Sequence, residues 1–173
     1  MLCKRYRSVK LIVISDTHGY ADVYIERILR LHRDCDAVLF LGDGIRDFTD
    51  MNVRNFFAVR GNCDIYCPED VPTERLLTFD GVTILMMHGH TYSVKSGTAR
   101  LEAYARALGA DVALYGHTHR REERYCRGEN EEKGIYLFNP GSLGESRGDA
   151  PTYGIVEIKK GQLLLSFGDA SRI

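Results

Sequence analysis

Short apolar runs that end at polar residues constrain the fold more strongly than any other feature of this sequence. Five of them fall in the first two-thirds of the chain: Val9–Ser15, Ala37–Gly42, Asn55–Gly61, Val82–His88 and Asp111–Gly116. Each run is short, β-branched or aromatic in character and bounded by Gly or Asp, which is typical of buried strands. We therefore expect a sheet built from short internal strands.

Two amphipathic segments alternate with these runs. The first carries apolar residues at helical spacing, namely Ala21, Tyr24, Ile25, Ile28, Leu29 and His32. The second repeats the spacing at Leu101, Tyr104, Ala105 and Leu108, and Gly109 follows as a helix-terminating residue. Strands that alternate with helices favour a mostly parallel sheet with helices on its faces.

The pattern in the rest of the chain predicts strands joined by tight turns. Asp80-Gly81 separates Glu74–Phe79 from Val82–Met87, and Lys160-Gly161 separates Ile155–Lys159 from Gln162–Phe167. Both dipeptides favour β-hairpins, the first more strongly. Arg120–Cys126 and Ile135–Asn139 are extended candidates around the polar stretch Arg127–Gly134. These strands predict a second sheet stacked on the first, and the lack of an internal repeat or linker predicts one domain over residues 1–173.

Composition excludes several classes of function. The 173 residues carry a net charge of −1, so no overall basic field would hold nucleic acid, and we expect no stable nucleic-acid complex. The run Arg120–Arg124 mixes signs of charge and favours a solvated strand face. No apolar stretch approaches the ~18 residues of a membrane span, so we expect no membrane association. A homo-oligomer is left open.

The compartment is inferred from the start of the chain and from its cysteines. The charged start resembles that of a signal peptide, but the apolar run Leu11–Ile14 is too short for one. The five cysteines are odd in number and contain no CxxC pair, which argues against a disulfide framework and against a cysteine zinc site. A reducing cytoplasm fits this pattern best.

Polar side chains suited to metals follow the predicted strands. The carboxyl ends of parallel strands meet at one crevice. At four of the five strand ends, a Gly beside the polar residue permits a positive φ and a close turn, whereas the first strand continues directly to Asp16. Five of the six histidines lie in these segments: His18, His88, His90, His117 and His119. Four imidazoles with two aspartates and one amide suit Mn, Fe, Co or Zn better than Mg or Ca. Seven ligands exceed one tetrahedral site, so two metals sharing an Asp is the economical interpretation.

Five motifs, taken in order, resemble the motif series of the calcineurin-like metallophosphoesterases: Asp16-Thr17-His18, Gly42-Asp43, Gly61-Asn62, His88-Gly89 and Gly116-His117-Thr118-His119. The chain length and the segment Asn139-Pro140-Gly141-Ser142 are similar to the small prokaryotic phosphodiesterase branch. The resemblance extends from Asp16 to about Ser142 and is specific as a set. It implies an α/β fold, a four-layer α/β/β/α sandwich of two stacked mixed sheets flanked by helices.

The resemblance also implies a role for each ligand. Asp16, His18 and His119 would hold one metal ion, and Asn62, His88 and His117 the other. Asp43 would bridge the two ions, for which Mn is favoured and Fe, Co, Ni and Zn are alternatives. The implied reaction is hydrolysis of a phosphodiester by a hydroxide bound to the two metals. A phosphomonoesterase and a non-catalytic protein scaffold of the same fold are the alternatives.

Asp43 and Asn62 are the predicted catalytic residues, and Asn62, Cys63 and His90 are predicted to contact substrate. For His90 a plain loop histidine is the alternative. Many relatives of this family carry a histidine where this chain has Cys63. A thiol with an ordinary pKa of about 8.5 is a poor general acid near pH 7, so protonation of the leaving group has no evident donor. A nucleophilic Cys63 is disfavoured because the sequence offers no dedicated base.

Four further polar residues have predicted supporting roles. His32 lies on an apolar helix stripe and is expected to be structural. Asp64 is expected to orient a neighbouring side chain or backbone. Asn139 and Ser142 either line the site or form a turn around Pro140.

Overall fold

The structure is a computed structural model that describes residues 8–128, 133–147 and 150–173. The charged start considered as a signal peptide, residues 1–7, lies outside the described residues, as do residues 129–132 of the predicted polar stretch.

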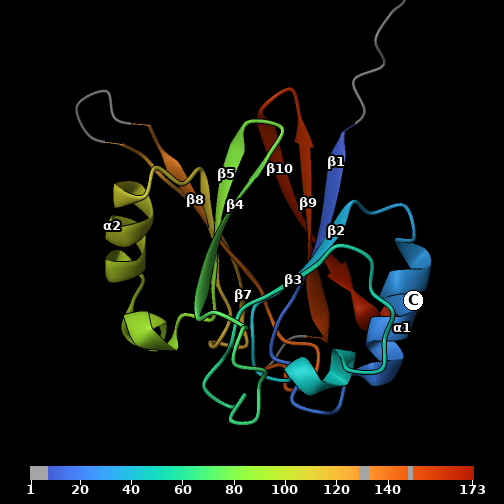
Figure 1. The fold of residues 1–173 in the computed structure, drawn as a ribbon. Coiled ribbons are helices and arrows are strands. Elements are labelled where there is room, and N and C mark those ends of the chain that lie inside the picture. Colours follow the sequence, from blue (N-terminus) through green and yellow to red (C-terminus); the bar gives the residue numbers. More distant parts are fainter. Residues whose placement is uncertain (1–7, 129–132, 148–149) are drawn as a thin grey trace, which may run out of the picture.

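The described strands form two five-stranded sheets that stack face to face (Figure 1). The first sheet contains β1 (Val9–Ile14), β2 (Ala37–Phe40), β3 (Phe56–Ala58), β9 (Thr152–Lys159) and β10 (Gln162–Asp169), in the order β10-β9-β1-β2-β3. The second contains β4 (Glu74–Phe79), β5 (Val82–Met87), β6 (Val112–Leu114), β7 (Arg121–Cys126) and β8 (Ile135–Pro140), in the order β4-β5-β6-β8-β7. Both sheets are mixed, as the family resemblance implies.

Helices cover the outer faces of the two sheets, α1 (Asp22–Leu31) on the first and α2 (Ala99–Ala107) on the second (Figure 1). Short 3₁₀ turns complete the chain: η1 (Ile45–Phe48), η2 (His90–Tyr92), η3 (Val94–Ser96) and η4 (Ala170–Arg172). The molecule therefore has the predicted four layers, helix, sheet, sheet and helix.

Alternation along β1 explains why this strand is buried on both faces. Leu11 and Val13 belong to the core between the sheets, whereas Ile12 and Ile14 pack in the core that contains α1 residues. Successive side chains of a strand point to opposite faces, so an unbroken apolar run is required wherever a sheet is covered on both sides. Each fully buried aliphatic side chain contributes roughly 1.5–3 kcal/mol to folding.

The two predicted hairpins are confirmed. β4 pairs with β5 and β9 with β10, both antiparallel and in continuous register. Asp80 and Gly81 have φ of 44° and 80°, and Lys160 and Gly161 have φ of 53° and 72°. Positive φ at both central residues is the requirement of a type I′ turn, so each turn matches the twist of its strands.

The parallel strands are divided between the sheets, which differs from the single mostly parallel sheet that the local pattern favours. β1, β2 and β3 are parallel in the first sheet, and β5, β6 and β8 are parallel in the second. The carboxyl ends of both sets lie at one end of the sandwich, opposite the two hairpin turns (Figure 1). The loops that follow these strands therefore meet across the sandwich rather than along one sheet.

Candidate metal centre

Loops at the carboxyl ends of the parallel strands carry all seven predicted ligands. Five of these residues have positive φ, between 51° and 70°: Asp16, His18, Asp43, His117 and His119. Such a backbone conformation costs about 1–3 kcal/mol in a non-glycine residue and is concentrated at functional sites. Hydrogen bonds between loops hold it in place, for example Asp16 N–H to the Gly42 carbonyl at 3.0 Å and His18 N–H to the Asp43 carbonyl at 3.1 Å.

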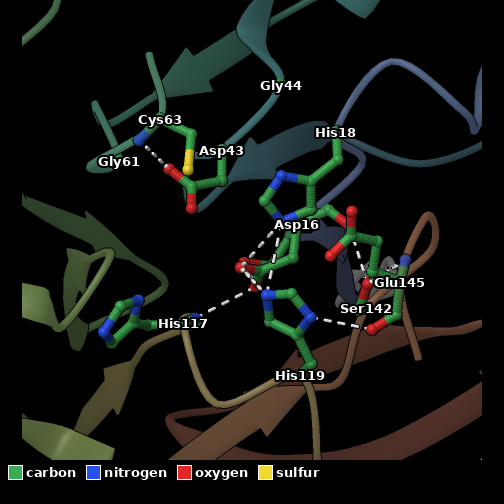
Figure 2. A network of polar contacts seen from close by, with 12 residues as sticks. Asp16, His18, Asp43, Gly44, Gly61, Cys63, His117, His119, Ser142 and Glu145 are labelled. Atoms are coloured by element: carbon green, nitrogen blue, oxygen red, sulfur yellow. Dashed lines mark hydrogen bonds and ion pairs between the residues drawn. The ribbon is translucent and has the colours of Figure 1, made fainter. Parts of the chain in front are cut away.

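The first cluster consists of Asp16, His18 and His119, which face one another in Figure 2. The Nε2 atoms of His18 and His119 lie 3.3 Å apart. Oδ1 of Asp16 lies 3.2 Å from Nε2 of His119 and 3.9 Å from Nε2 of His18. Three potential donor atoms from two loops therefore surround one small volume.

The second cluster consists of Asp43, His88 and His117. Nε2 of His88 lies 3.2 Å from Oδ2 of Asp43 and 3.2 Å from Oδ1 of Asn62. The rings of His88 and His117 have centroids 5.0 Å apart. The amide oxygen of Asn62 and the ring nitrogens thus approach the same point as the Asp43 carboxylate.

Asp43 lies between the two clusters. Its carboxylate belongs to the second cluster and also forms a compact group with His18 and Cys63, whose ligand atoms lie within 4.8 Å of one another. Since His18 is a member of the first cluster, one carboxylate is within reach of both sets. The expected bridging position of Asp43 is compatible with this placement.

Hydrogen bonds of the outer ring nitrogens fix the tautomers of two histidines. Nδ1 of His88 lies 2.8 Å from the Leu41 carbonyl, and Nδ1 of His119 lies 2.7 Å from the Glu145 carbonyl. A carbonyl only accepts, so each Nδ1 is protonated and, in the neutral ring, each Nε2 presents a lone pair to the centre. Metal-ligating histidines are typically oriented in this way.

Asp16 supplies the test of whether a cation fits. Its Oδ2 accepts hydrogen bonds from Ser15 Oγ at 2.5 Å and from His117 N–H at 3.0 Å. The buried Oδ1 has no hydrogen-bond partner among the residues that the structure describes. A buried carboxylate oxygen facing nitrogen lone pairs is destabilised unless a positive charge lies between them. The residues present therefore fit divalent metal ions.

Electrostatic coupling shifts the ionisation of several of these groups. Burial alone would raise the pKa of Asp43, but the hydrogen bond and charge of His88 and the Cys63 N–H hold it well below its ordinary value. Burial opposes protonation of His88, yet the carboxylates of Asp43 and Asp16 raise its pKa. Burial and the nearby charges of His88 and Lys95 lower the pKa of His117 to about 4. The Asp43 carboxylate is thus ionised, and the His117 ring neutral, near pH 7.

The glycines beside the ligands act in two ways, of which only one was predicted. Gly42 has a φ of 97°, as expected for a glycine that permits a left-handed turn. Gly61 and Gly116 do not have positive φ. A Cβ at Gly61 would collide with the Asp43 carboxylate, and one at Gly116 with Ser15 and Asp16. These two glycines therefore leave room for a ligand carboxylate.

Asp64 ties the loop after β2 to the loop after β3. Its carboxylate accepts four backbone N–H groups, from Asp43, Gly44, Ile45 and Gly61, at 2.8–3.0 Å. Hydrogen bonds to an ionised group are among the stronger ones, roughly 1.5–3 kcal/mol each. The expectation that Asp64 orients its neighbours is confirmed.

Asn139 and Ser142 are buried and support the ligand loops. Asn139 Nδ2 donates to the Gly116 carbonyl at 2.9 Å, and Ser142 Oγ donates to the Asp16 carbonyl at 2.7 Å. Two further residues, which had no predicted role, contact candidate ligands: Ser15 Oγ donates to Asp16, and the Glu145 carbonyl accepts from His119. The Glu145 contact uses a backbone group, so no side-chain signal marks it in the sequence.

Cys63 and His90, the predicted substrate-contacting residues other than Asn62, lie at the edge of the candidate centre. Cys63 is exposed, its N–H donates to Asp43 Oδ1 at 2.7 Å, and its Sγ lies 3.1 Å from Asn62 Nδ2. Burial, the hydrogen bond to Asp43 and nearby carboxylates raise the pKa of Cys63 to about 11. The ring of His90 has its centroid 5.4 Å from that of His88 and 6.2 Å from that of His117.

Comparison with known proteins identifies the family. A model of the calcineurin-like phosphoesterase superfamily domain matches residues 9–161. The chain belongs to this superfamily. A probable metallophosphoesterase of Mycoplasma pneumoniae is 32% identical over 161 residues, covering 89% of this chain and 92% of the relative. The probable metallophosphoesterase YsnB of Bacillus subtilis is 30% identical over 136 residues, covering 78% and 75%. The resemblance inferred from the motifs is confirmed, and the chain is a hydrolase of the metallophosphoesterase family.

More distant relatives share the fold or carry a more specific description. The phosphodiesterase MJ0936 of Methanocaldococcus jannaschii is 27% identical over 171 residues, covering 88% of this chain and 95% of the relative. A predicted phosphoesterase from Streptococcus pneumoniae superposes with a TM-score of 0.76 at 24% identity, covering 95% and 91%. Vacuolar Protein Sorting 29 from Cryptosporidium parvum superposes with a TM-score of 0.71 at 16% identity, covering 93% and 97%. The predicted fold is confirmed, and these descriptions differ enough that the fold alone does not define an activity.

Within the described residues, no helix combines the length and apolar character that crossing a membrane requires.

Proposed function

We propose that this chain is a metal-dependent phosphodiesterase that binds two divalent ions. The observation that carries the proposal is the pair of ligand clusters with the Asp43 carboxylate between them. The Nδ1–H groups of His88 and His119 donate to backbone carbonyls, which leaves their Nε2 atoms free to bind cations. The buried Asp16 Oδ1, which has no hydrogen-bond partner among the described residues, likewise favours cations over a purely structural polar network.

Each ligand then has a defined role in the proposal. Asp16, His18 and His119 would hold one ion, Asn62, His88 and His117 would hold the other, and Asp43 would serve both. Mn²⁺ is the proposed ion, since imidazole-rich sites with carboxylates suit Mn, Fe, Co, Ni or Zn. Such ions, when bound, lower the pKa of water and stabilise negative charge on phosphoryl oxygens.

The chain's own residues would position the substrate. The Asn62 amide oxygen points to His88, so its Nδ2 is the end available to a phosphate oxygen. His90 lies beside His117 at the rim and would contact the phosphate or its substituent. The Cys63 thiol stays protonated at neutral pH because its pKa is raised to about 11. A neutral thiol is a weak proton donor, so substrates whose leaving groups are stable as anions are favoured.

The preference for a diester has two supports. The relative MJ0936 is described as a phosphodiesterase, and this chain has a neutral thiol at the position where a protonated histidine would offset the second charge of a monoester. Both sheets supply ligands to one centre, which supports a single domain over residues 1–173. We place the protein in the cytoplasm on its cysteine pattern.

Two measurements test the proposal. Protein reconstituted with Mn²⁺ and freed of excess metal should contain two ions per chain by elemental analysis, and about one ion would contradict a dinuclear centre.

Bis(p-nitrophenyl) phosphate and p-nitrophenyl phosphate share a leaving group, so their comparison isolates the ester class. We expect kcat/KM for the diester to be higher by about ten-fold or more, equivalent to ~1.4 kcal/mol. Equal or higher activity on the monoester would contradict the diester assignment.

A further inference from the structure

A cavity of about 300 Å³ opens directly beside the candidate metal centre. His18 and Cys63 line it on the side of the centre, and Arg46, Ile65 and Tyr66 line it farther out. Pockets of roughly 300–1,000 Å³ accommodate small-molecule ligands. A substituent on a phosphate held at the centre would therefore enter a space of suitable size.

The outer wall of this cavity carries apolar side chains that the fold does not bury. Ile65 is 80% exposed and Tyr66 is 77% exposed. Their segment is nevertheless firmly placed, because Asp64 is anchored by its four backbone hydrogen bonds. The turn is closed by Ile65 N–H to the Cys63 carbonyl at 3.0 Å and Cys67 N–H to the Asp64 carbonyl at 3.3 Å. Exposed apolar groups on a fixed segment beside a site are typical of ligand contacts.

Arg46 and Tyr66 together form a flat surface. The guanidinium carbon of Arg46 lies 4.9 Å from the centroid of the Tyr66 ring. Tyr66 is 77% exposed, so most of its ring surface stays accessible with Arg46 beside it. Within the described part of the chain, Arg46 forms no ion pair, whereas Asp47 accepts the Gly19 N–H and Asp64 is occupied by backbone groups. The wall thus offers an aromatic face next to a guanidinium group.

We propose that Tyr66 and Arg46 bind a flat aromatic substituent of the phosphodiester, which makes nucleotides the substrate class of this centre. The inference rests on the proposed function and extends it from an ester type to a substrate class. Stacking of a base on an aromatic ring contributes about 1–3 kcal/mol by alanine substitution, and a guanidinium beside the ring adds attraction for electron-rich bases and for phosphate.

Direct binding to the Mn²⁺-supplemented protein tests the subsite without requiring turnover. Adenosine 5′-phosphate and ribose 5-phosphate carry the same phosphate and sugar and differ only in the base. Isothermal titration calorimetry should give a Kd about ten-fold lower for adenosine 5′-phosphate. Tyr66→Ala should remove this difference, and Tyr66→Phe should keep it because the ring remains. Tyr20→Ala is the matched control, since Tyr20 is 73% exposed and does not line the cavity.

Two binding results would overturn the proposal. One is equal affinity of the wild-type protein for the two phosphates, and the other is a base preference that persists in Tyr66→Ala. Metal content and circular dichroism of each variant show whether a lost preference is local. A fall in base preference with unchanged metal content and fold supports the subsite.

Hydrolysis rates of two diesters, one with a base and one without, distinguish failure of the base subsite from failure of the proposed phosphodiesterase function. Thymidine 5′-p-nitrophenyl phosphate and methyl p-nitrophenyl phosphate release the same leaving group. We expect Tyr66→Ala to raise KM for the thymidine ester about ten-fold while leaving kcat and the methyl ester unchanged. If neither ester is hydrolysed but the base preference in binding persists, the proposed function fails and the subsite stands. Equal effects of Tyr66→Ala on the two esters would contradict the subsite alone.

Discussion

The two ends of the sandwich use the same backbone conformation for different purposes. At the hairpin end, Asp80 and Lys160 have positive φ and are each followed by a glycine. At the other end, positive φ occurs at candidate ligands such as Asp16 and Asp43. A left-handed residue in a type I′ turn closes the hairpin and points its side chain outward. The same conformation at the candidate metal centre turns a candidate ligand inward.

The two ends also differ in what holds the strained residues. Each hairpin turn is stabilised by the strands it joins, which pair in continuous register. The ligand loops are instead held by residues distant in sequence, for example Ser142, whose hydroxyl contacts the Asp16 carbonyl across 126 positions. The strained residues at the hairpin end are therefore stabilised by neighbouring residues in the sequence, whereas those at the ligand end are stabilised only when the whole fold has formed.

The largest contrast between the ends should appear on removing one carboxylate charge from each. Asp43→Asn should lower the metal content below two per chain and reduce kcat/KM for bis(p-nitrophenyl) phosphate about 10³-fold, because loss of metal removes several kcal/mol of transition-state stabilisation. Asp80→Asn should leave both values unchanged, since Asn suits a type I′ turn. Elemental analysis and steady-state kinetics provide the measurements. A fully active, metal-replete Asp43→Asn protein would remove Asp43 from the site.

An intermediate contrast is expected from adding one methyl group at each end. In Gly116→Ala the new Cβ would meet Ser15 and Asp16, so the ligand must move, and we expect Mn²⁺ affinity to fall about 10–100-fold, as for other groups that orient metal ligands. Gly81→Ala meets no atom within 4 Å but has a φ of 80°. It should lose about 1 kcal/mol of stability with unchanged metal affinity. Metal titration and urea unfolding distinguish the two; equal metal affinities would contradict the proposed role of Gly116.

The smallest effect concerns His32, the histidine that ends α1 away from the ligand loops. Its Nε2 lies 2.8 Å from the Tyr153 hydroxyl. Burial and the charge of Lys10 lower its pKa, opposed by Asp34. The unfolded chain therefore binds a proton at a higher pH than the folded one, and stability falls as pH decreases through about 6.5 towards the folded pKa.

Comparison of the wild-type protein with His32→Gln measures this contribution. Urea unfolding between pH 7.5 and 5 should show a shallower decline in the variant, because glutamine does not titrate. The ligand histidines are present in both proteins, so their titration largely cancels in the difference. Identical pH slopes would show that His32 has the same pKa in the folded and unfolded chains.

Local patterns in the sequence predicted most of the elements correctly. The unbroken run at β1, the helical stripe of α1 and the Asp80-Gly81 turn each depend on residues within about ten positions of one another. The structural role of His32 also follows locally, because the histidine lies on an apolar stripe. The motif order identified the family for the same reason, since each motif is a short contiguous segment.

Only the tertiary structure decided how these segments combine. The sequence by itself determined which residues are candidate metal ligands and that they follow strands. It did not determine that β3 and β6 belong to different sheets, that Gly61 and Gly116 make room for carboxylates, or that Asp64 joins two loops. A strand pattern shows which faces are buried but not which strand is the neighbour, and that choice follows from packing two whole sheets against each other. The distances within the metal centre are consequences of that packing.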